Sequence, residues 1–91
     1  MSTTAEREAT RIRRRAILSV LLFADVQTMP VRRLRDELEA LYGQVVTVDR
    51  VRADVLWLAD VGLVRAGADV AALTEDGRDV VLERKPMPGE A

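Results

Sequence analysis

The sequence predicts a single, mainly α-helical domain that also contains one small β-hairpin. Three observations lead to this prediction. The 91 residues, 48% of them hydrophobic and 32% charged, are enough for one hydrophobic core and too few for two. Apolar residues recur at helical spacing through most of the chain. After Gly62 this spacing gives way to two short runs around a Gly-containing turn.

We expect the domain to occupy residues 1–85 and to be followed by a flexible tail, residues 86–91. Pro86 and Pro88 predict an extended backbone in that tail. The core should consist mainly of small aliphatic side chains, because the chain has thirteen Val, twelve Ala and eleven Leu but only 3% aromatic residues.

The first predicted helix covers residues 4–25. Thr3 and Glu6 have the spacing of a capping box, and apolar residues then recur every three or four positions. The run from residue 16 to 24 is apolar on nearly every side, so we expect the rest of the domain or a second copy to cover it, which favours a homodimer. The run has the outline of a secretory signal, but it is too short to span a membrane and has a poor cleavage site. A buried helix of a cytoplasmic protein in a bacterial host, without membrane contact, is therefore our expectation.

Two more helices are predicted at residues 30–42 and 47–61. Pro30 suits a helix start and Gly43 a helix end, while Thr47 can cap the helix that follows. The connection between the two helices is as short as in a helix-turn-helix.

The remaining residues predict a β-hairpin at 63–73 and a last helix at 75–84. The hairpin turn is expected at residues 66–68, and Thr74 should cap the last helix. The alternative is a plain helical bundle in which residues 63–73 are coil. The favoured order is helix, helix, helix, hairpin, helix.

A specific motif runs through the second half of the chain. It consists of Val51, Val55, Leu58, Gly62, Leu63 and Val64, followed by Leu73, Thr74 and Gly77. This motif resembles the signature V-x3-L-x2-L-x3-G-L-V … L-T-x2-G of winged-helix repressors of the ArsR and MarR kinds. The resemblance implies a winged helix-turn-helix fold, in which the third helix is the reading helix and the hairpin is the wing.

Three segments are also similar to small winged-helix proteins of Mu-like phages and prophages. They are VRADVLWL (51–58), LTEDGRDVV (73–81) and RKPMPG (84–89). This chain departs from their pattern by lacking a second Gly after the last helix and by inserting Lys85. The resemblance implies a phage-encoded transcription regulator that binds double-stranded DNA. The alternative is a phage-encoded adaptor or morphogenesis protein that binds a phage or host protein.

Charge limits how such a protein could bind DNA. With 14 basic and 15 acidic residues the formal net charge is −1, so contact with DNA must be local. Asp49, Asp54 and Asp60 on the expected reading helix would repel phosphates. The candidate DNA contacts are Arg50 and Arg52 on that helix, Arg65 in the wing, and Arg11, Arg14 and Arg15 in the first helix.

A candidate protein interface consists of Leu56, Trp57 and Val61. If Trp57 is exposed, the three side chains form an apolar patch of the kind that binds protein. If the first helix or the wing covers Trp57, that residue belongs to the core. The sequence leaves both alternatives open.

Missing residue types argue against an enzyme. The chain has no Cys and no His, so it lacks a thiol nucleophile, the usual general base and the usual ligands of transition metals. No glycine-rich phosphate loop or nucleophile elbow is present. The acidic residues of 75–90 suit the first turn of a helix rather than a calcium loop. We therefore expect no catalysis, no cofactor and no metal.

Overall fold

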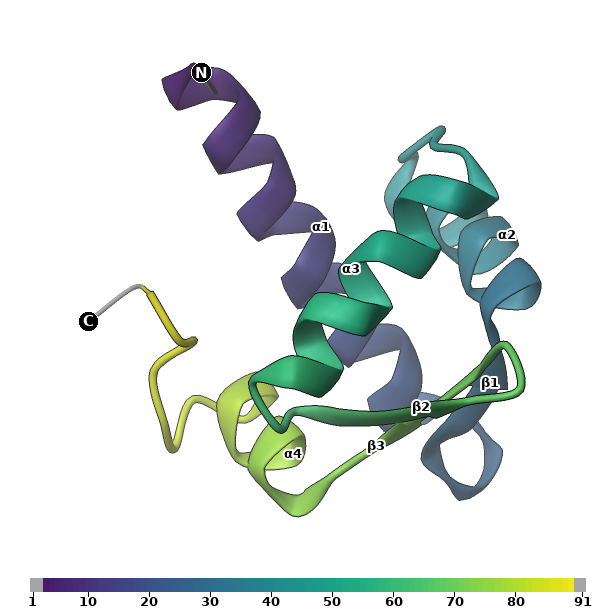
Figure 1. Ribbon diagram of the computed structural model, residues 1–91, viewed down its shortest axis with the longest axis vertical. Helices are drawn as coiled ribbons and strands as arrows, with labels where there is room; N and C mark the ends of the chain where they lie inside the picture. The colour runs from purple at the N-terminus through teal and green to yellow at the C-terminus, as the bar shows by residue number, and fades with distance from the viewer. Residues whose placement is uncertain (1–2, 90–91) are drawn as a thin grey trace.

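A three-stranded antiparallel sheet and four α-helices form the fold of residues 3–89, the part of the chain that this computed structural model describes (Figure 1). In chain order the elements are α1 (Thr4–Phe23), the 3-10 turn η1 (Asp25–Gln27), β1 (Thr28–Pro30), α2 (Val31–Tyr42), α3 (Val48–Asp60), β2 (Val64–Gly67), β3 (Val70–Leu73) and α4 (Glu75–Val81). This arrangement confirms the predicted fold class, a mainly α-helical winged helix-turn-helix.

The helices begin where the sequence predicts, within one residue, because hydroxyl side chains cap three of them. The Oγ1 atoms of Thr3, Thr47 and Thr74 each accept a hydrogen bond from a backbone N–H three residues later, at 3.0 to 3.1 Å. The helix ends were predicted less well. α1 stops at residue 23 instead of 25 because Ala24 is extended, and α4 stops at 81 instead of 84, two residues before Glu83 adopts a φ of 61°.

The strand β1 was not predicted. Its three residues pair antiparallel with β3, so that Thr28 lies opposite Ala72 and Pro30 opposite Val70, and the strand order is β1-β3-β2. Three residues are too few to show an alternating pattern. Pro30 itself was assigned to the start of the following helix, although proline is tolerated at a sheet edge, where no ladder hydrogen bond is lost.

The tip of the wing also differs from the prediction. The two residues that connect β2 to β3 are Ala68 and Asp69, with φ values of 50° and 60°, whereas Gly67 ends β2 and has no positive φ. Two-residue hairpins favour this left-handed conformation because it matches the twist of the strands. Glycine therefore did not mark the turn, which consists of residues 68–69 and not of the expected residues 66–68.

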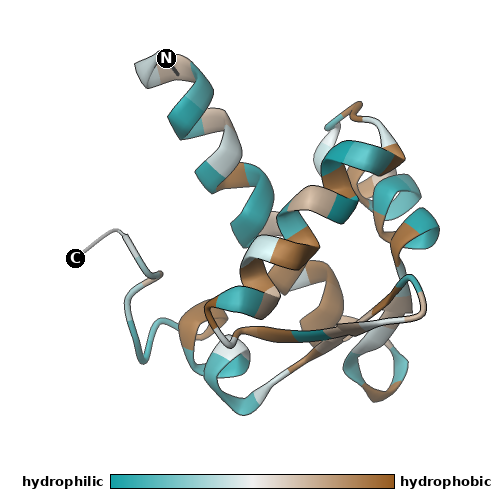
Figure 2. Cartoon of the chain, in the orientation of Figure 1, coloured by the Kyte–Doolittle hydropathy of each residue, from teal (hydrophilic) through white to brown (hydrophobic). Residues whose placement is uncertain are grey.

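One domain covers most of the apolar run of α1. Ile17, Leu18 and Leu21 are fully buried, in a core shared with α2, α3, α4 and the sheet, while Phe23 is 86% exposed. Of the two expected alternatives, the rest of the domain covers most of this run, and the homodimer stays a prediction. Figure 2 shows the contrast along α1, whose N-terminal half is hydrophilic and projects from the rest of the domain.

The segment after α4 is not a simple extended tail. Met87 is 2% exposed and belongs to the core cluster, and the flexibility of residues 86–91 stays a prediction. Residues 90–91 of the predicted tail lie outside the described residues. None of the helices in the described part of the chain is long and apolar enough to cross a membrane.

Candidate nucleic-acid interface

The helix α3 lies at the surface, where it follows α2 after a connection of residues 43–47 (Figure 1). Gly62, with a φ of 81°, then turns the chain out of α3 toward the wing. The exposed residues of α3 are Asp49, Arg50, Ala53, Leu56 and Asp60. Most of this outward surface is therefore acidic or apolar, and Arg50 lies at its border.

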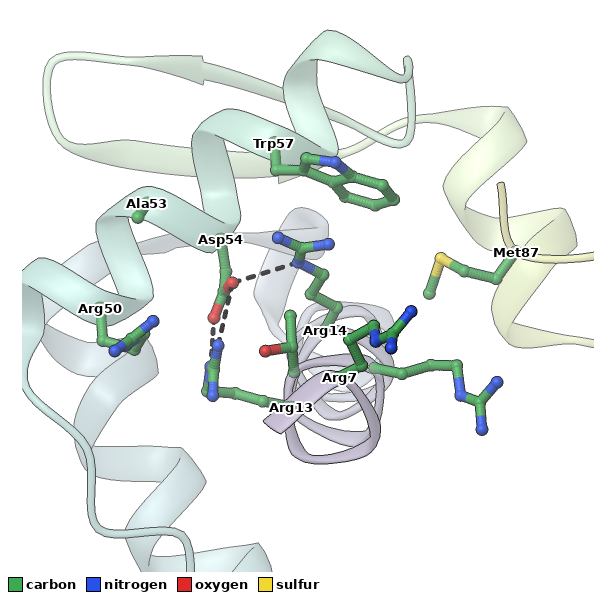
Figure 3. A pocket seen from close by; sticks show the side chains of 10 residues that line it. Arg7, Arg13, Arg14, Arg50, Ala53, Asp54, Trp57 and Met87 are labelled. Atoms are coloured by element: carbon green, nitrogen blue, oxygen red, sulfur yellow. Dashed lines mark hydrogen bonds and ion pairs between the residues drawn. The ribbon is translucent and has the colours of Figure 1, made fainter. Parts of the chain in front are cut away.

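Asp54 does not lie on that surface, which corrects the sequence-based expectation. It is only 2% exposed and accepts hydrogen bonds from Arg13 and Arg14 of α1, the latter at 3.1 Å from Nε (Figure 3). A carboxylate can be buried at this position because two guanidinium groups replace its hydration. Asp54 therefore presents no negative charge to a ligand of α3.

Arg52 connects α3 to the tip of the wing. Its Nε and terminal NH2 group donate to the two carboxylate oxygens of Asp69 at 2.7 and 3.1 Å, and its other terminal NH2 group donates to Asp49 at 2.7 Å. The hydrogen bond from Arg52 is the main reason why the pKa of Asp69 lies below its ordinary value. Two carboxylates thus already bind this candidate DNA contact.

The candidate contact in the wing, Arg65, is exposed on β2. The strands β2 and β3 carry no other cation. The wing therefore offers one positive charge, next to the tip at which Asp69 binds Arg52.

A basic cavity lies on the other side of α3, between it and the N-terminal half of α1 (Figure 3). Its volume is about 410 Å³, and we call it the arginine cavity. It is lined by Arg7, Arg11, Arg13, Arg14, Arg50, Thr10, Ala53, Asp54, Trp57 and Met87. The structure thus brings together three of the predicted DNA contacts, Arg11, Arg14 and Arg50.

The arginine cavity also contains two arginines that the sequence analysis did not single out, Arg7 and Arg13. The spacing of Arg7, Arg11 and Arg14 places them on one face of a helix, which was a usable signal. No sequence signal linked Arg13 to Asp54, because the two residues are 41 positions apart. Arg15 is half-buried on α1 and lies outside the cavity, and Arg52 and Arg65 belong to the wing side of α3.

The three residues of the predicted protein interface differ in exposure. Trp57 is half-buried, and the guanidinium carbon of Arg14 lies 4.0 Å from the centre of its ring, a cation–π contact. Leu56 is 56% exposed and borders a separate groove, between α3 and the wing. Val61 is half-buried against the core. Arg14 of α1 thus lies over the ring of Trp57, and a protein interface at these three residues stays a prediction.

The described residues contain no group of three or more His, Cys, Asp or Glu side chains arranged to bind a metal ion. The chemistry that the site offers is instead that of guanidinium groups, which bind phosphate and carboxylate oxygens through paired hydrogen bonds.

No family model matches the chain, and no curated protein matches it. Two solved structures are similar. The complex structure of hsRosR-S1 superimposes with a TM-score of 0.67 at 29% sequence identity, and the match covers 78% of this chain and 65% of that one. The second is Sco5413, a MarR family transcriptional regulator from Streptomyces coelicolor, with a TM-score of 0.66, 24% identity and coverage of 84% and 55%.

The chain therefore has the fold of winged-helix regulators and spans less than two thirds of the length of each neighbour. The similarity to phage proteins has no counterpart in these two structures.

Proposed function

We propose that this chain is a DNA-binding winged-helix domain of a transcription regulator and not an enzyme. The observation that carries the proposal is the position of α3, which is exposed between a wing on one side and the arginine cavity on the other. In winged-helix regulators this helix enters the major groove, and flanking cations bind the phosphates. The MarR family neighbour supports the same function.

The charges on the two sides of α3 predict how such a complex would form. Arg11, Arg14 and Arg50 would contact phosphates from the arginine cavity, and Arg65 would contact them from the wing. The outward residues of α3 offer few donors to base edges, since Ala53 and Leu56 lie between two aspartates. We therefore expect phosphate contacts to supply most of the affinity and base contacts to supply little sequence preference.

A titration against duplex DNA at several salt concentrations tests the proposal. We expect measurable binding at about 50 mM salt, a steep loss of affinity by about 200 mM, and a slope that flattens by about one unit for each phosphate contact removed. Arg50→Gln and Arg65→Gln should each flatten the slope. Arg84→Gln is the matched control, because Arg84 is exposed after α4 and lies outside both the arginine cavity and the groove between α1 and α2. Absence of binding by the folded protein in low salt would contradict the proposal.

A second candidate function is that of an adaptor that binds protein through α3. The exposed Leu56, at the mouth of the groove between α3 and the wing, favours it. An adaptor should bind its partner with little dependence on salt, and Leu56→Ala should weaken that binding more than Arg50→Gln. In a regulator the order of the two effects should be reversed.

We also propose that the chain forms a homodimer, because it leaves large apolar side chains exposed on one side of the domain. The exposed Phe23, Leu41 and Tyr42 border one groove between α1 and α2 and are the candidate contact surface. Light scattering at tens of micromolar should give twice the monomer mass of 10.1 kDa, and a monomer mass would contradict this proposal.

A further inference from the structure

We infer that the arginine cavity between α1 and α3 is a binding site for phosphate groups. The inference concerns the cavity itself and does not require that α3 enters a DNA groove. It rests on the charge of the cavity, on the side chains that reach it from two helices, and on its size.

The charge of the cavity is strongly unbalanced. Five arginines line it, and the only carboxylate among its lining residues within the described chain is Asp54. Asp54 already binds two of the five, Arg13 and Arg14, and the carboxylate of Glu8 on α1 binds a third, Arg11. Guanidinium groups keep their charge at any physiological pH, so their mutual repulsion cannot be relieved by loss of a proton. A bound anion would relieve it.

Two of the arginines have no ion pair with any other described residue. Arg7 comes from the projecting half of α1 and is exposed, and Arg50 comes from the first turn of α3 and is also exposed (Figure 3). A ligand that reached both side chains would be bound from two different helices. Each planar guanidinium can donate two parallel hydrogen bonds to phosphate oxygens.

The other walls of the cavity fix its shape. The buried pair of Arg13 and Asp54 joins α1 to α3, and Arg14 is held between Asp54 and the ring of Trp57. Met87 closes one end from the segment after α4. Arg7 and Arg50, the arginines that remain for a ligand, therefore border a cavity whose other walls are already ordered. This lowers the entropic cost of binding.

The size of the cavity favours a ligand larger than one inorganic ion. About 410 Å³ lies within the range of about 300 to 1,000 Å³ that is usual for small-molecule sites. Phosphate is favoured over a carboxylate because a phosphate group has more oxygens that can accept hydrogen bonds from guanidinium groups. Such a group can come from a phosphorylated small molecule or from the backbone of a nucleic acid.

Pyrophosphate is the probe for the test, and Trp57 is the reporter, because it lines the cavity and is the only tryptophan of the chain. Titration of pyrophosphate at constant ionic strength should change the tryptophan fluorescence in a saturable way. Calorimetry of the same titration detects binding if the indole does not respond. A folded protein that gives no saturable signal by either method would overturn the inference.

Substitutions locate the binding. Arg7→Gln and Arg50→Gln should each weaken pyrophosphate binding about tenfold, which corresponds to the loss of one hydrogen-bonded charge. Both side chains are exposed and unpaired with described residues, so the variants should fold, as circular dichroism would verify. Arg84→Gln, at an exposed position outside the cavity, is the control and should bind like the original protein. Equal losses in all three variants would indicate diffuse attraction and would overturn the inference.

Competition with short duplex DNA distinguishes the two sources of phosphate. If DNA displaces pyrophosphate, and Arg7→Gln weakens both, the cavity binds the DNA backbone. If DNA binds without displacing pyrophosphate, the cavity serves a phosphorylated small molecule. Both results support a phosphate site. DNA binding without any pyrophosphate binding would overturn this inference and leave the proposed regulator function standing. Pyrophosphate binding without any DNA binding would contradict the regulator function and leave this inference standing.

Discussion

Asp54 of α3 and Arg13 of α1 form a buried ion pair between two helices, with exposed fractions of 2% and 7%. The pair closes the floor of the arginine cavity and joins the N-terminal half of α1 to the rest of the domain. Because Asp54 also binds Arg14, one carboxylate fixes two guanidinium groups.

Removal of the Asp54 carboxylate should strongly destabilise the fold. We expect Asp54→Ala to lower the free energy of unfolding by about 3 to 5 kcal/mol, because it leaves the charge of Arg13 buried without a partner. Asp60→Ala is the control, since Asp60 is exposed on the same helix and its loss should cost less than about 0.5 kcal/mol. Urea denaturation of the two variants measures the difference. Equal stabilities would show that the pair contributes nothing.

The contacts of Asp54 could not be predicted from the sequence. Local patterns predicted the helices well, because a cap such as Thr47 and an apolar stripe act within one element. The role of Asp54 depends on a residue 41 positions away, and the helical spacing of α3 alone does not reveal which neighbour meets it. For the same reason, the sequence predicted only part of the arginine cavity. The arginines on α1 were noticed, but only the packing of α1 on α3 brings them to Arg50.

Gly77 is a second position at which tertiary packing determines which residue fits. A Cβ atom on Gly77 would lie 2.0 Å from the carbonyl oxygen of Leu63 and 2.7 Å from Cδ1 of Leu73. Since the nearest atom belongs to the backbone, it cannot move aside without distorting the wing. We expect Gly77→Ala to cost at least about 2 kcal/mol of stability.

The control for that substitution is Gly67→Ala. Gly67 has no positive φ, and a Cβ atom added to it would meet nothing within 4 Å. Its replacement should change the melting temperature little, while Gly77→Ala should lower it by about 8 °C or more. Similar melting temperatures for the two variants would argue against the close contact with Leu63.

A substitution at the tip of the wing should stabilise the fold. Ala68 has a φ of 50°, a left-handed conformation that costs an alanine about 1 to 2 kcal/mol and that asparagine adopts more readily. Ala68→Asn should therefore raise the free energy of unfolding by about 0.5 to 1 kcal/mol. Ala66→Asn, on the exposed strand β2, should not stabilise the protein. A loss of stability in Ala68→Asn would refute the assigned turn.

The ion pair of Asp69 with Arg52 should appear in an NMR titration. Because the hydrogen bond from Arg52 lowers the pKa of Asp69 from its ordinary value of 3.8, the carboxylate stays charged to lower pH in the folded protein. A lowered pKa stabilises the fold at pH values above 3.8, and that stabilisation disappears as the pH falls through the lowered pKa. Arg52→Gln should return the pKa of Asp69 toward its ordinary value. An unchanged titration curve would contradict the pairing.

The same pair makes a prediction about DNA binding under the proposed function. In the free protein Asp69 and Asp49 both bind Arg52, so a phosphate must compete with two carboxylates for it. Asp69→Asn removes one competitor and one repelling charge from the tip of the wing. We expect the variant to bind duplex DNA more tightly and its salt dependence to become steeper by about one unit, as expected when Arg52 binds one additional phosphate. Glu75→Gln, an equal change of charge at an exposed position of α4, is the control for the general effect of net charge. If both variants bound DNA more tightly to the same degree, Arg52 would not be the residue released, and the DNA contact would have to be assigned to the arginine-cavity side of α3.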